Sequence, residues 1–247
     1  MKSIGICIVI NAPFSFVKTC IDNAIRALNG ANVRFYIFDN ASIDSRTSDY
    51  CKAVCESFAK TENPIKKQYF EETHKPIQDS LAYNKLFQRV EEDFICVLPI
   101  DVIVNDNWAI DLLNAIESVH SSGVVGIRTG EDKTQLSFAL SIPENAYSTE
   151  SMRPVWQPQE FAIVGVFLMR TNVVRIIGGY DEFLFGAGYE RDEMCYRFKA
   201  NGYVNFYVFG QNSVATNGAP FKNTNHNELY LSRIAQMNKS QIFKKQF

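Results

Sequence analysis

The sequence predicts an α/β domain of three layers, with helices on both faces of a mainly parallel central sheet. Two observations support this. Apolar runs alternate with helical patterns in the first half of the chain, an order that requires crossovers between parallel strands. The 247 residues, 46% of them hydrophobic, are enough for one sizeable core. We therefore expect a single domain over residues 1–247, with one half at about 1–127 and the other at about 128–247.

The first half is predicted to alternate strand and helix. Apolar runs mark the strands, and apolar residues at helical spacing mark the helices. In chain order the expected elements are a strand at 4–10, a helix at 16–28, a strand at 33–38, a helix at 47–59, a strand at 67–70, a helix at 77–90, a strand that begins at Phe94, and a helix after Asn105 or Asp106, either of which can cap it.

The second half is less regular. Residues 129–160 are polar, dotted with proline and weakly periodic, which predicts a long loop with function at its rim. The other expected elements are a strand in "GVVGIR", a strand in "EFAIVGVFLMR", a short helix and turn in "RTNVVRIIGGYDEFLF", an amphipathic helix in "ERDEMCYRFKANGY" that ends at Gly202, and a strand in "VNFYVFG".

Composition excludes several classes of partner. The net charge is −2, so nothing attracts the chain globally to nucleic acid or to an anionic membrane. The segment "MKSIGICIVINAPF" lacks a signal cleavage site, and the tail "FKKQF" is too small for stable membrane attachment. Six scattered cysteines are expected to be reduced thiols; Cys51 and Cys55 share helical spacing, but no second pair completes a zinc site. We expect a cytoplasmic protein without stable membrane insertion, and its oligomeric state stays open.

Polar residues stand where several expected strands end. Asp101 interrupts the apolar stretch "FICVLPIDVIVNDNW", and a carboxylate inside a sheet core would be costly to desolvate. It therefore belongs at a strand end, and open α/β sheets bind ligands outside the carboxyl ends of their strands. Asn11 and the run "FDNASID" follow two other strands. Asp39 and Asp44 in that run could instead form Asx-turns, and the acids from Glu190 to Glu193 could serve only the helix dipole.

Taken in order, these segments resemble glycosyltransferase family 2, which has the GT-A fold, a Rossmann-like three-layer domain. The matching segments cover most of the chain: "IGICIVINAPFSFVKTCIDNAI", "YIFDNASID", "SLAYNKLFQRVEEDFICVLPIDVIVNDNW" and "IIGGYDEFLFGAGYERDEMCYRFKANGY". The resemblance implies an inverting hexosyl or deoxyhexosyl transferase that moves a sugar from a nucleotide-diphosphate donor to a hydroxyl of a glycan. Residues 1–127 would then bind the nucleotide sugar, and residues 128–247 the acceptor.

The resemblance also assigns the donor-binding residues. Asp39 matches the family position that accepts a hydrogen bond from the nucleotide base, and Val9 and Asn11 would line the base and ribose. Asn84 matches an asparagine near the donor in an Ala-Arg-Asn-like helix. A UDP- or dTDP-sugar is favoured, and a GDP-sugar is possible.

A divalent cation is implied at Asp101. This residue stands at the final acid of the family's D-x-D motif, which is reduced here to Pro99-Ile100-Asp101. Mn²⁺ or Mg²⁺ prefers oxygen ligands and keeps waters and substrate phosphates, so one carboxylate can suffice. The family often adds a histidine after the last strand, where this chain has Asn217; His226 is a possible substitute or simply a surface residue.

In the family, the catalytic base comes from a Glu-Asp-x-Asp helix, and this chain departs from that pattern. Glu190 matches the glutamate, but Arg191 replaces the aspartate usually assigned as base, and Glu193 replaces the last aspartate. Arginine cannot remove a proton near neutral pH, so Asp192, Glu190 or Glu193 would have to do so. Arg191 itself could pair with the donor diphosphate, for which its planar donor fork is suited.

Acceptor contacts are expected from two places. Tyr180 and Asp181 follow a Gly178-Gly179 turn that would face them toward the acceptor, although the turn could be purely structural. Trp156 is placed either to stack against a sugar ring or only to fix its loop between two prolines.

Two other functions compete with transfer. A nucleotidyltransferase would carry a glycine-rich phosphate loop, which "INAPFSF" lacks. A catalytically degenerate module that binds a nucleotide sugar or a glycan would explain Arg191 and the reduced D-x-D motif.

Overall fold

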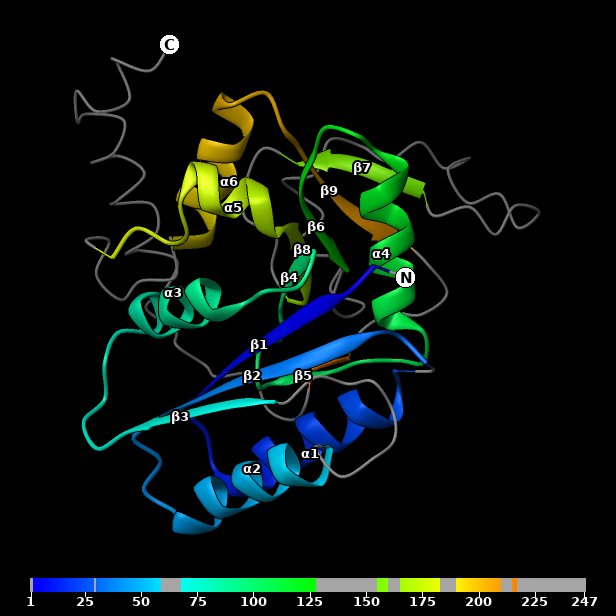
Figure 1. Ribbon diagram of the computed structural model, residues 1–247. Helices are drawn as coiled ribbons and strands as arrows, with labels where there is room; N and C mark the ends of the chain where they lie inside the picture. Colours follow the sequence, from blue (N-terminus) through cyan, green and yellow to red (C-terminus); the bar gives the residue numbers. More distant parts are fainter. Residues whose placement is uncertain are drawn as a thin grey trace.

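The computed structural model describes residues 2–28, 30–58, 68–127, 155–159, 165–182, 190–209 and 215–216. In this part of the chain, an eight-stranded sheet lies between helices, and a two-stranded sheet flanks it (Figure 1). The strands are β1 Ile4–Ile10, β2 Val33–Asn40, β3 Tyr69–Thr73, β4 Phe94–Val97, β5 Val102–Ile103, β6 Ser122–Ile127, β7 Val155–Gln159, β8 Phe167–Arg170, β9 Val204–Phe209 and β10 Ala215–Thr216. The helices are α1 Phe14–Arg26, α2 Ser45–Phe58, α3 Asp79–Arg89, α4 Trp108–Ser118, α5 Thr171–Ile177 and α6 Glu190–Ala200.

The sheet is mainly parallel, as predicted. Its strand order is β3-β2-β1-β4-β8-β6-β9-β7, and only β8 and β7 run against the other strands. The pairing of β1 with β2 sets Ile10 opposite Asp39, so these two strands end at the same level. The reversal at β8 could not be predicted, because an apolar run indicates a strand but not its direction.

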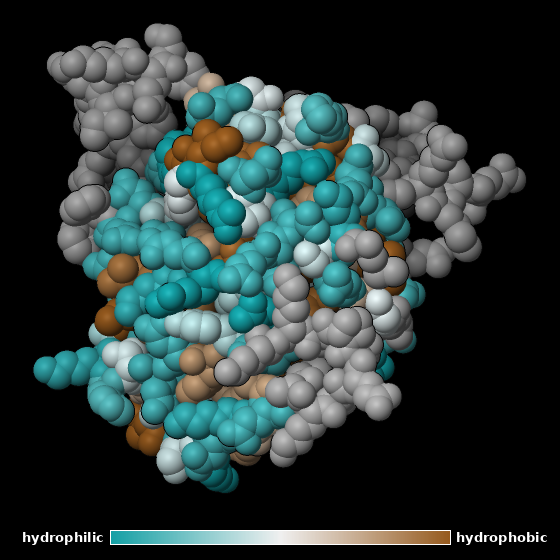
Figure 2. Space-filling view, in the orientation of Figure 1, coloured by the Kyte–Doolittle hydropathy of each residue, from teal (hydrophilic) through white to brown (hydrophobic). Residues whose placement is uncertain are grey.

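Two hydrophobic clusters fill the two faces of the sheet and confirm the three layers. The even-numbered residues of β1, such as Ile6 and Ile8, pack with α1, α2 and α4, whereas Cys7 and Val9 pack with α3, α5 and α6. All residues of β1 are buried, as expected for a strand covered on both faces. On the face seen in Figure 2, hydrophilic residues cover most of the described surface, and hydrophobic ones gather only in small groups.

The structure corrects two local predictions. Helix α4 begins at Trp108, and the residue before it, Asn107, has a φ of +67° and no capping side-chain hydrogen bond, so neither Asn105 nor Asp106 is the cap. Residues 155–159 form the edge strand β7 within the segment that was predicted as a loop. The sequence of this segment did not indicate a strand, because its extended conformation depends on backbone pairing with β9.

The cysteines are free thiols, as predicted from their scattered positions. Among the residues that the structure describes, no group of three or more His, Cys, Asp or Glu side chains could hold a metal ion, so Cys51 and Cys55 belong to no zinc site there. No helix within the described ranges has both the length and the apolar character needed to span a bilayer.

Candidate functional site

The carboxyl ends of β1, β2 and β4 bring the predicted site residues to one edge of the sheet. Asn11 directly follows β1, Asp39 lies at the end of β2, and Asp101 lies in the turn between β4 and β5. Asp101 is exposed, as its position in an interrupted apolar run indicated, whereas Asp39 is only 3% exposed. The edge therefore offers one carboxylate in water and one inside the wall of the site.

The Asp39 carboxylate fixes the turn after β2, but its hydrogen bond reaches three residues on, so it is not the Asx-turn that the sequence left open. Its Oδ1 accepts a hydrogen bond from the backbone N–H of Ser42 at 2.9 Å, and Ala41 between them has a φ of +61°. This bond fixes the carboxylate but uses one oxygen, so a role in ligand binding is compatible with the turn. Asp44 makes a second turn, accepting from the N–H of Arg46 at 3.1 Å and forming an ion pair with its guanidinium.

A network around Asp79 was missed by the sequence analysis. Asp79 begins α3, and its two oxygens accept hydrogen bonds from Asn11 at 3.0 Å and Asn40 at 3.2 Å. Asn40 also bonds both backbone groups of Ile77 at 2.8 Å, which anchors the segment leading into α3. Burial raises the pKa of Asp79, against the effect of these hydrogen bonds and of the positive charge of Arg191. Asp79 was not a candidate in the sequence analysis, because nothing in the neighbouring sequence indicates that it contacts Asn11 and Asn40.

Arg191, the second residue of α6, brings a positive charge into this acidic edge. Burial acts to lower the pKa of Arg191, but Tyr180, Tyr83, Asp101 and Glu190 outweigh it and raise that pKa above its usual value. The side chain is therefore charged at any pH relevant to folding. The rings of Tyr83 and Tyr180 meet edge to face with centroids 5.8 Å apart. The charge of Arg191 is thus stabilised electrostatically by two phenols and two acids.

Asn84 holds the turn after α5. Its amide donates to the carbonyl of Tyr180 at 2.8 Å and to the carboxylate of Glu182 at 2.9 Å, and its Oδ1 accepts from the N–H of Tyr180 at 2.8 Å. The amide is thus engaged inside the protein, and the geometry gives Asn84 the role of positioning Tyr180. Tyr180 is 6% exposed and packs on Tyr83 and Phe87, so it forms part of the wall rather than a free platform.

We expect Gly179→Ala to lower the free energy of unfolding by about 2 kcal/mol, the usual range for overpacking. A Cβ at this position would lie 2.2 Å from Oδ1 of Asn84 and 3.1 Å from Cδ2 of Phe87. Urea denaturation measures the loss. Gly202→Ala is the control for backbone strain alone, since Gly202 has a φ of +83° and nothing within 4 Å. In an Asn84→Ala background the cost of Gly179→Ala should fall; an unchanged cost would contradict this steric explanation.

Glu193 is not a free base. It forms an ion pair with Arg197, whose Nη2 lies 2.6 Å from Oε2. Arg197 also donates to the carbonyls of Ile177 at 2.9 Å, Gly178 at 3.4 Å and Gly179, joining α6 to the turn after α5. The carboxylate of Glu193 is thus engaged by a guanidinium, and its role as base stays a prediction. Glu190 is partly buried near Arg191, and the side chain of Asp192 lies outside the described atoms.

A family model described as "Glycosyl transferase family 2" matches residues 3–177, well over half of the chain. The chain belongs to this family. The match spans the strand ends that carry Asn11, Asp39 and Asp101, and it stops before α6. No curated protein sequence matches the chain significantly.

Solved structures confirm that this family 2 chain has the GT-A fold. GalNAc-T7 with UDP, GalNAc and Mn²⁺ aligns with a TM-score of 0.65 at 14% identity, over 87% of this chain and 44% of that one. The mannosyltransferase PcManGT from Pyrobaculum calidifontis with GDP-Man and Mn²⁺ aligns with a TM-score of 0.63 at 12% identity, over 89% and 58%. S. aureus TarS, residues 1–349, aligns with a TM-score of 0.60 at 13% identity, over 87% and 60%. The chain thus spans about half the length of these proteins.

The described residues do not by themselves form a site for a divalent cation. Asp101 is the one acid of the reduced motif, because Pro99 has no side-chain oxygen and its carbonyl accepts hydrogen bonds from Val102 at 3.2 Å and Cys20 at 3.6 Å. The positive charge of Arg191 also acts on Asp101, and it would repel a second cation. His226 lies outside the described residues. The cation stays an expectation, and the reaction proposed below does not depend on it.

The predicted acceptor residues divide between two places. Trp156 lies in β7, where its backbone pairs with Val208, and its side chain lies outside the described atoms. In the strand order, β9, β6, β8 and β4 stand between β7 and β1, so the sheet does not bring Trp156 next to the Asp39 edge. Asp181 directly follows Tyr180 and is partly buried. Their roles toward an acceptor stay predictions.

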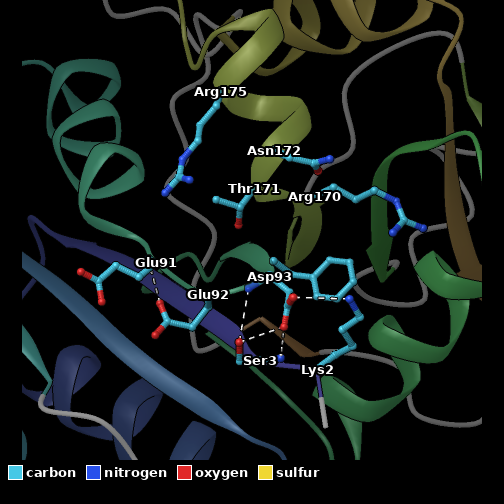
Figure 3. A pocket seen from close by; sticks show the side chains of 10 residues that line it. Lys2, Ser3, Glu91, Glu92, Asp93, Arg170, Thr171, Asn172 and Arg175 are labelled. Carbon is cyan, nitrogen blue, oxygen red and sulfur yellow. Dashed lines mark hydrogen bonds and ion pairs between the residues drawn. The ribbon is translucent and has the colours of Figure 1, made fainter.

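A polar pocket of about 370 Å³ lies at the other edge of the sheet (Figure 3). Ser3 precedes β1 and Asp93 precedes β4, so the pocket faces the amino ends of these strands. Asp93 accepts hydrogen bonds from the N–H and hydroxyl of Ser3 at 2.9 and 3.0 Å, and Lys2 lies 3.4 Å from it. Glu91, Glu92 and Asp93 lie on one side of this pocket, and Arg170 and Arg175 lie on the other (Figure 3). It is separate from the site at the carboxyl ends.

Proposed function

We propose that this protein transfers a sugar from a nucleotide-diphosphate donor to a hydroxyl of a glycan, with inversion at the anomeric carbon. The observation that carries the proposal is that Asp39 and Asp101 lie at the carboxyl ends of β2 and β4 in a family 2 chain, where the charge of Arg191 acts on Asp101. Ligands of open α/β sheets bind at this edge. The titles of two structural relatives, with UDP and with GDP-Man, support a nucleotide-sugar donor.

Asp39 is the residue proposed to select the base. Its Oδ1 is fixed by Ser42, so the orientation of Oδ2 is set before a ligand arrives. Oδ2 accepts the N3–H of uracil or thymine, or an N–H of guanine. Val9 is buried beneath this edge, and Asn11, held by Asp79, lies beside it. UDP- or dTDP-sugars are favoured because one acceptor oxygen matches one N–H donor.

In the proposed reaction, a carboxylate at the start of α6 removes the proton of the acceptor hydroxyl. The hydroxyl oxygen attacks the anomeric carbon from the face opposite the nucleotide. As the new glycosidic bond forms, the bond to the diphosphate oxygen breaks, and the electron pair leaves with the nucleoside diphosphate. Glu190 or Asp192 is the proposed base, because Glu193 is paired with Arg197. The guanidinium of Arg191 meets the charge that develops on the leaving group.

The second candidate function is a module that binds a nucleotide sugar or a glycan without turnover. It is favoured by one feature of the sequence, Arg191 at the position that the resemblance assigns to the family's base. Nucleotide binding without sugar transfer, over a broad set of donors and acceptors, would support this alternative. A cytoplasmic location also stays a proposal, and pelleting with membranes in high salt would contradict it.

Calorimetric titration of UDP, dTDP and GDP tests the donor proposal. We expect one of them to bind, and Asp39→Asn to weaken that binding about 10-fold or more, because the amide replaces a charged acceptor of a hydrogen bond. Asp44→Asn is the matched control, since Asp44 forms a similar turn but is paired with Arg46. Equal losses in the two variants would show that loop structure rather than base recognition is responsible, and would contradict the assignment of Asp39.

A further inference from the structure

We propose that Asp79 is a positioning residue of the donor site, whose carboxylate turns the side-chain amide of Asn11 so that the amide oxygen, and not its N–H groups, faces the nucleotide. The inference rests on the proposed function for the identity of the ligand. It deepens that function by assigning a residue that sets the polarity of one contact, and with it a preference for a ribose hydroxyl that donates a hydrogen bond.

Asp79 joins the ends of two strands. It is the first residue of α3, and its Oδ2 accepts a hydrogen bond from the amide of Asn11, directly after β1, at 3.0 Å. Its Oδ1 accepts from the amide of Asn40, the last residue of β2, at 3.2 Å. The pairing of β1 with β2 sets Ile10 opposite Asp39, so the two asparagines each follow this pair directly. Asp79 therefore bonds to the strand ends next to the level of Asp39.

The orientation of the Asn11 amide follows from the chemistry of its partner. An ionised carboxylate only accepts hydrogen bonds, so the part of the amide that faces Asp79 is the NH₂ group. The amide oxygen is then turned away from the carboxylate. Asn11 is exposed, and within the described part of the chain no hydrogen bond reaches its Oδ1. This oxygen is thus an oriented acceptor that is open to a ligand.

Asn40 predicts what happens when the carboxylate is replaced by an amide. Its own side chain is held at both ends by Ile77, because Nδ2 donates to the Ile77 carbonyl and Oδ1 accepts from the Ile77 N–H, each at 2.8 Å. Asn40 cannot turn without losing both bonds. In Asp79→Asn, the single new amide oxygen would pair with Asn40, and the new NH₂ group would face the NH₂ group of Asn11. The Asn11 amide is therefore expected to turn and to present its NH₂ group to the ligand.

An outward oxygen on Asn11 requires a hydrogen-bond donor on the ligand. Uracil or thymine in a nucleotide has one N–H group, which is assigned to Asp39, so the donors that remain are the ribose hydroxyls. Fluorine in place of such a hydroxyl cannot donate, and it would face the Asn11 oxygen as a second electronegative atom. A site that is built to accept from a hydroxyl rejects an analogue that lacks it. The wild-type site should therefore discriminate against the fluoro analogue, and the turned amide should not.

The test is calorimetric titration of whichever of UDP, dTDP and GDP binds, and of its analogues with fluorine in place of one ribose hydroxyl. For the wild type we expect at least one analogue to bind about 10-fold more weakly than the parent nucleotide. For Asp79→Asn this ratio of Kd values should fall to about 3-fold or less, with the parent still bound, because a hydroxyl can also accept from the turned NH₂ group. The diphosphate is common to both ligands, so the change of charge at residue 79 cancels in the ratio.

Two further variants separate positioning from folding. Asn11→Ala should also lose the discrimination, and adding Asp79→Asn to it should not change the ratio further, because both residues act through one contact. Asp93→Asn is the matched control. Asp93 accepts hydrogen bonds from the N–H and hydroxyl of Ser3 at 2.9 and 3.0 Å, at the opposite edge of the sheet, so its substitution should leave the ratio unchanged. Thermal unfolding checks that each variant is folded.

The outcomes distinguish this inference from the proposed function. A folded Asp79→Asn protein that keeps the wild-type ratio, or that loses the parent nucleotide as completely as the analogue, would overturn the inference but keep the proposed function. Wild-type protein that binds every analogue as tightly as the parent would do the same. Absence of nucleotide binding by the wild type would overturn both proposals.

Discussion

Replacing Glu190 with glutamine is expected to slow sugar transfer by a factor of about 10² to 10⁴, the usual contribution of a general base. Glu190 opens α6 beside Arg191, at the edge where the donor is proposed to bind. Glutamine keeps the shape of the side chain but cannot accept the proton of the acceptor hydroxyl. The rate is measured as release of nucleoside diphosphate at saturating donor, with donor affinity determined separately and expected to stay within about three-fold of wild type.

Two neighbouring substitutions make this test specific. Asp192→Asn examines the other proposed base, and Glu193→Gln is the control, because Glu193 is already paired with Arg197. A loss confined to Asp192→Asn would assign the base to Asp192. If neither Glu190→Gln nor Asp192→Asn slows an active protein, a base at the start of α6 is wrong.

Replacing Arg197 with methionine is expected to lower the free energy of unfolding by about 3 kcal/mol, the cost of leaving one partner of a largely buried ion pair alone. The Arg197 side chain is 24% exposed and that of Glu193 16%, so both are shielded from water. Arg197 also donates to the carbonyls of Ile177, Gly178 and Gly179, which would lose these bonds. Urea denaturation followed by circular dichroism measures the change.

The double variant Glu193→Gln with Arg197→Met is the control for this ion pair. It should be less destabilised than the sum of the two single changes, because no charge is then left unpaired. Additive losses would show that Glu193 and Arg197 do not interact in solution.

Because the turn after α5 carries Tyr180, we also expect Arg197→Met to weaken donor binding.

The positions of the strand ends could be predicted because they depend on the local pattern of apolar and polar residues. Apolar runs located β1, β2 and β4, and an acid that interrupts such a run must reach water, which placed Asp101 correctly. The family resemblance also came from local segments, and the family model confirms it over residues 3–177. The cysteines were predicted to be free thiols because they are scattered along the sequence, and the structure agrees.

Contacts across the fold were not predictable in this way. Glu193 and Arg197 pair within α6 at i,i+4 spacing, but their sequence does not show that Arg197 also donates to the carbonyls of Ile177, Gly178 and Gly179 in the turn after α5. Asn84 was assigned to the donor, but its amide is used by Tyr180, which is 96 residues away in the chain. The role of Asp79 could not be predicted, because its carboxylate accepts hydrogen bonds from Asn11 and Asn40, which lie at the ends of two strands.

The sequence alone determined the alternation of strands and helices, the family and the edge of the sheet that carries the site, since these depend on hydrophobic period and on which strands end in polar residues. The tertiary structure decided which of those polar residues have hydrogen-bond partners inside the protein and which are exposed to solvent. Hydrogen bonds and ion pairs between distant segments follow from how the helices pack on the sheet. That packing leaves Asp101 exposed and engages the side-chain amide of Asn84 with the backbone of Tyr180.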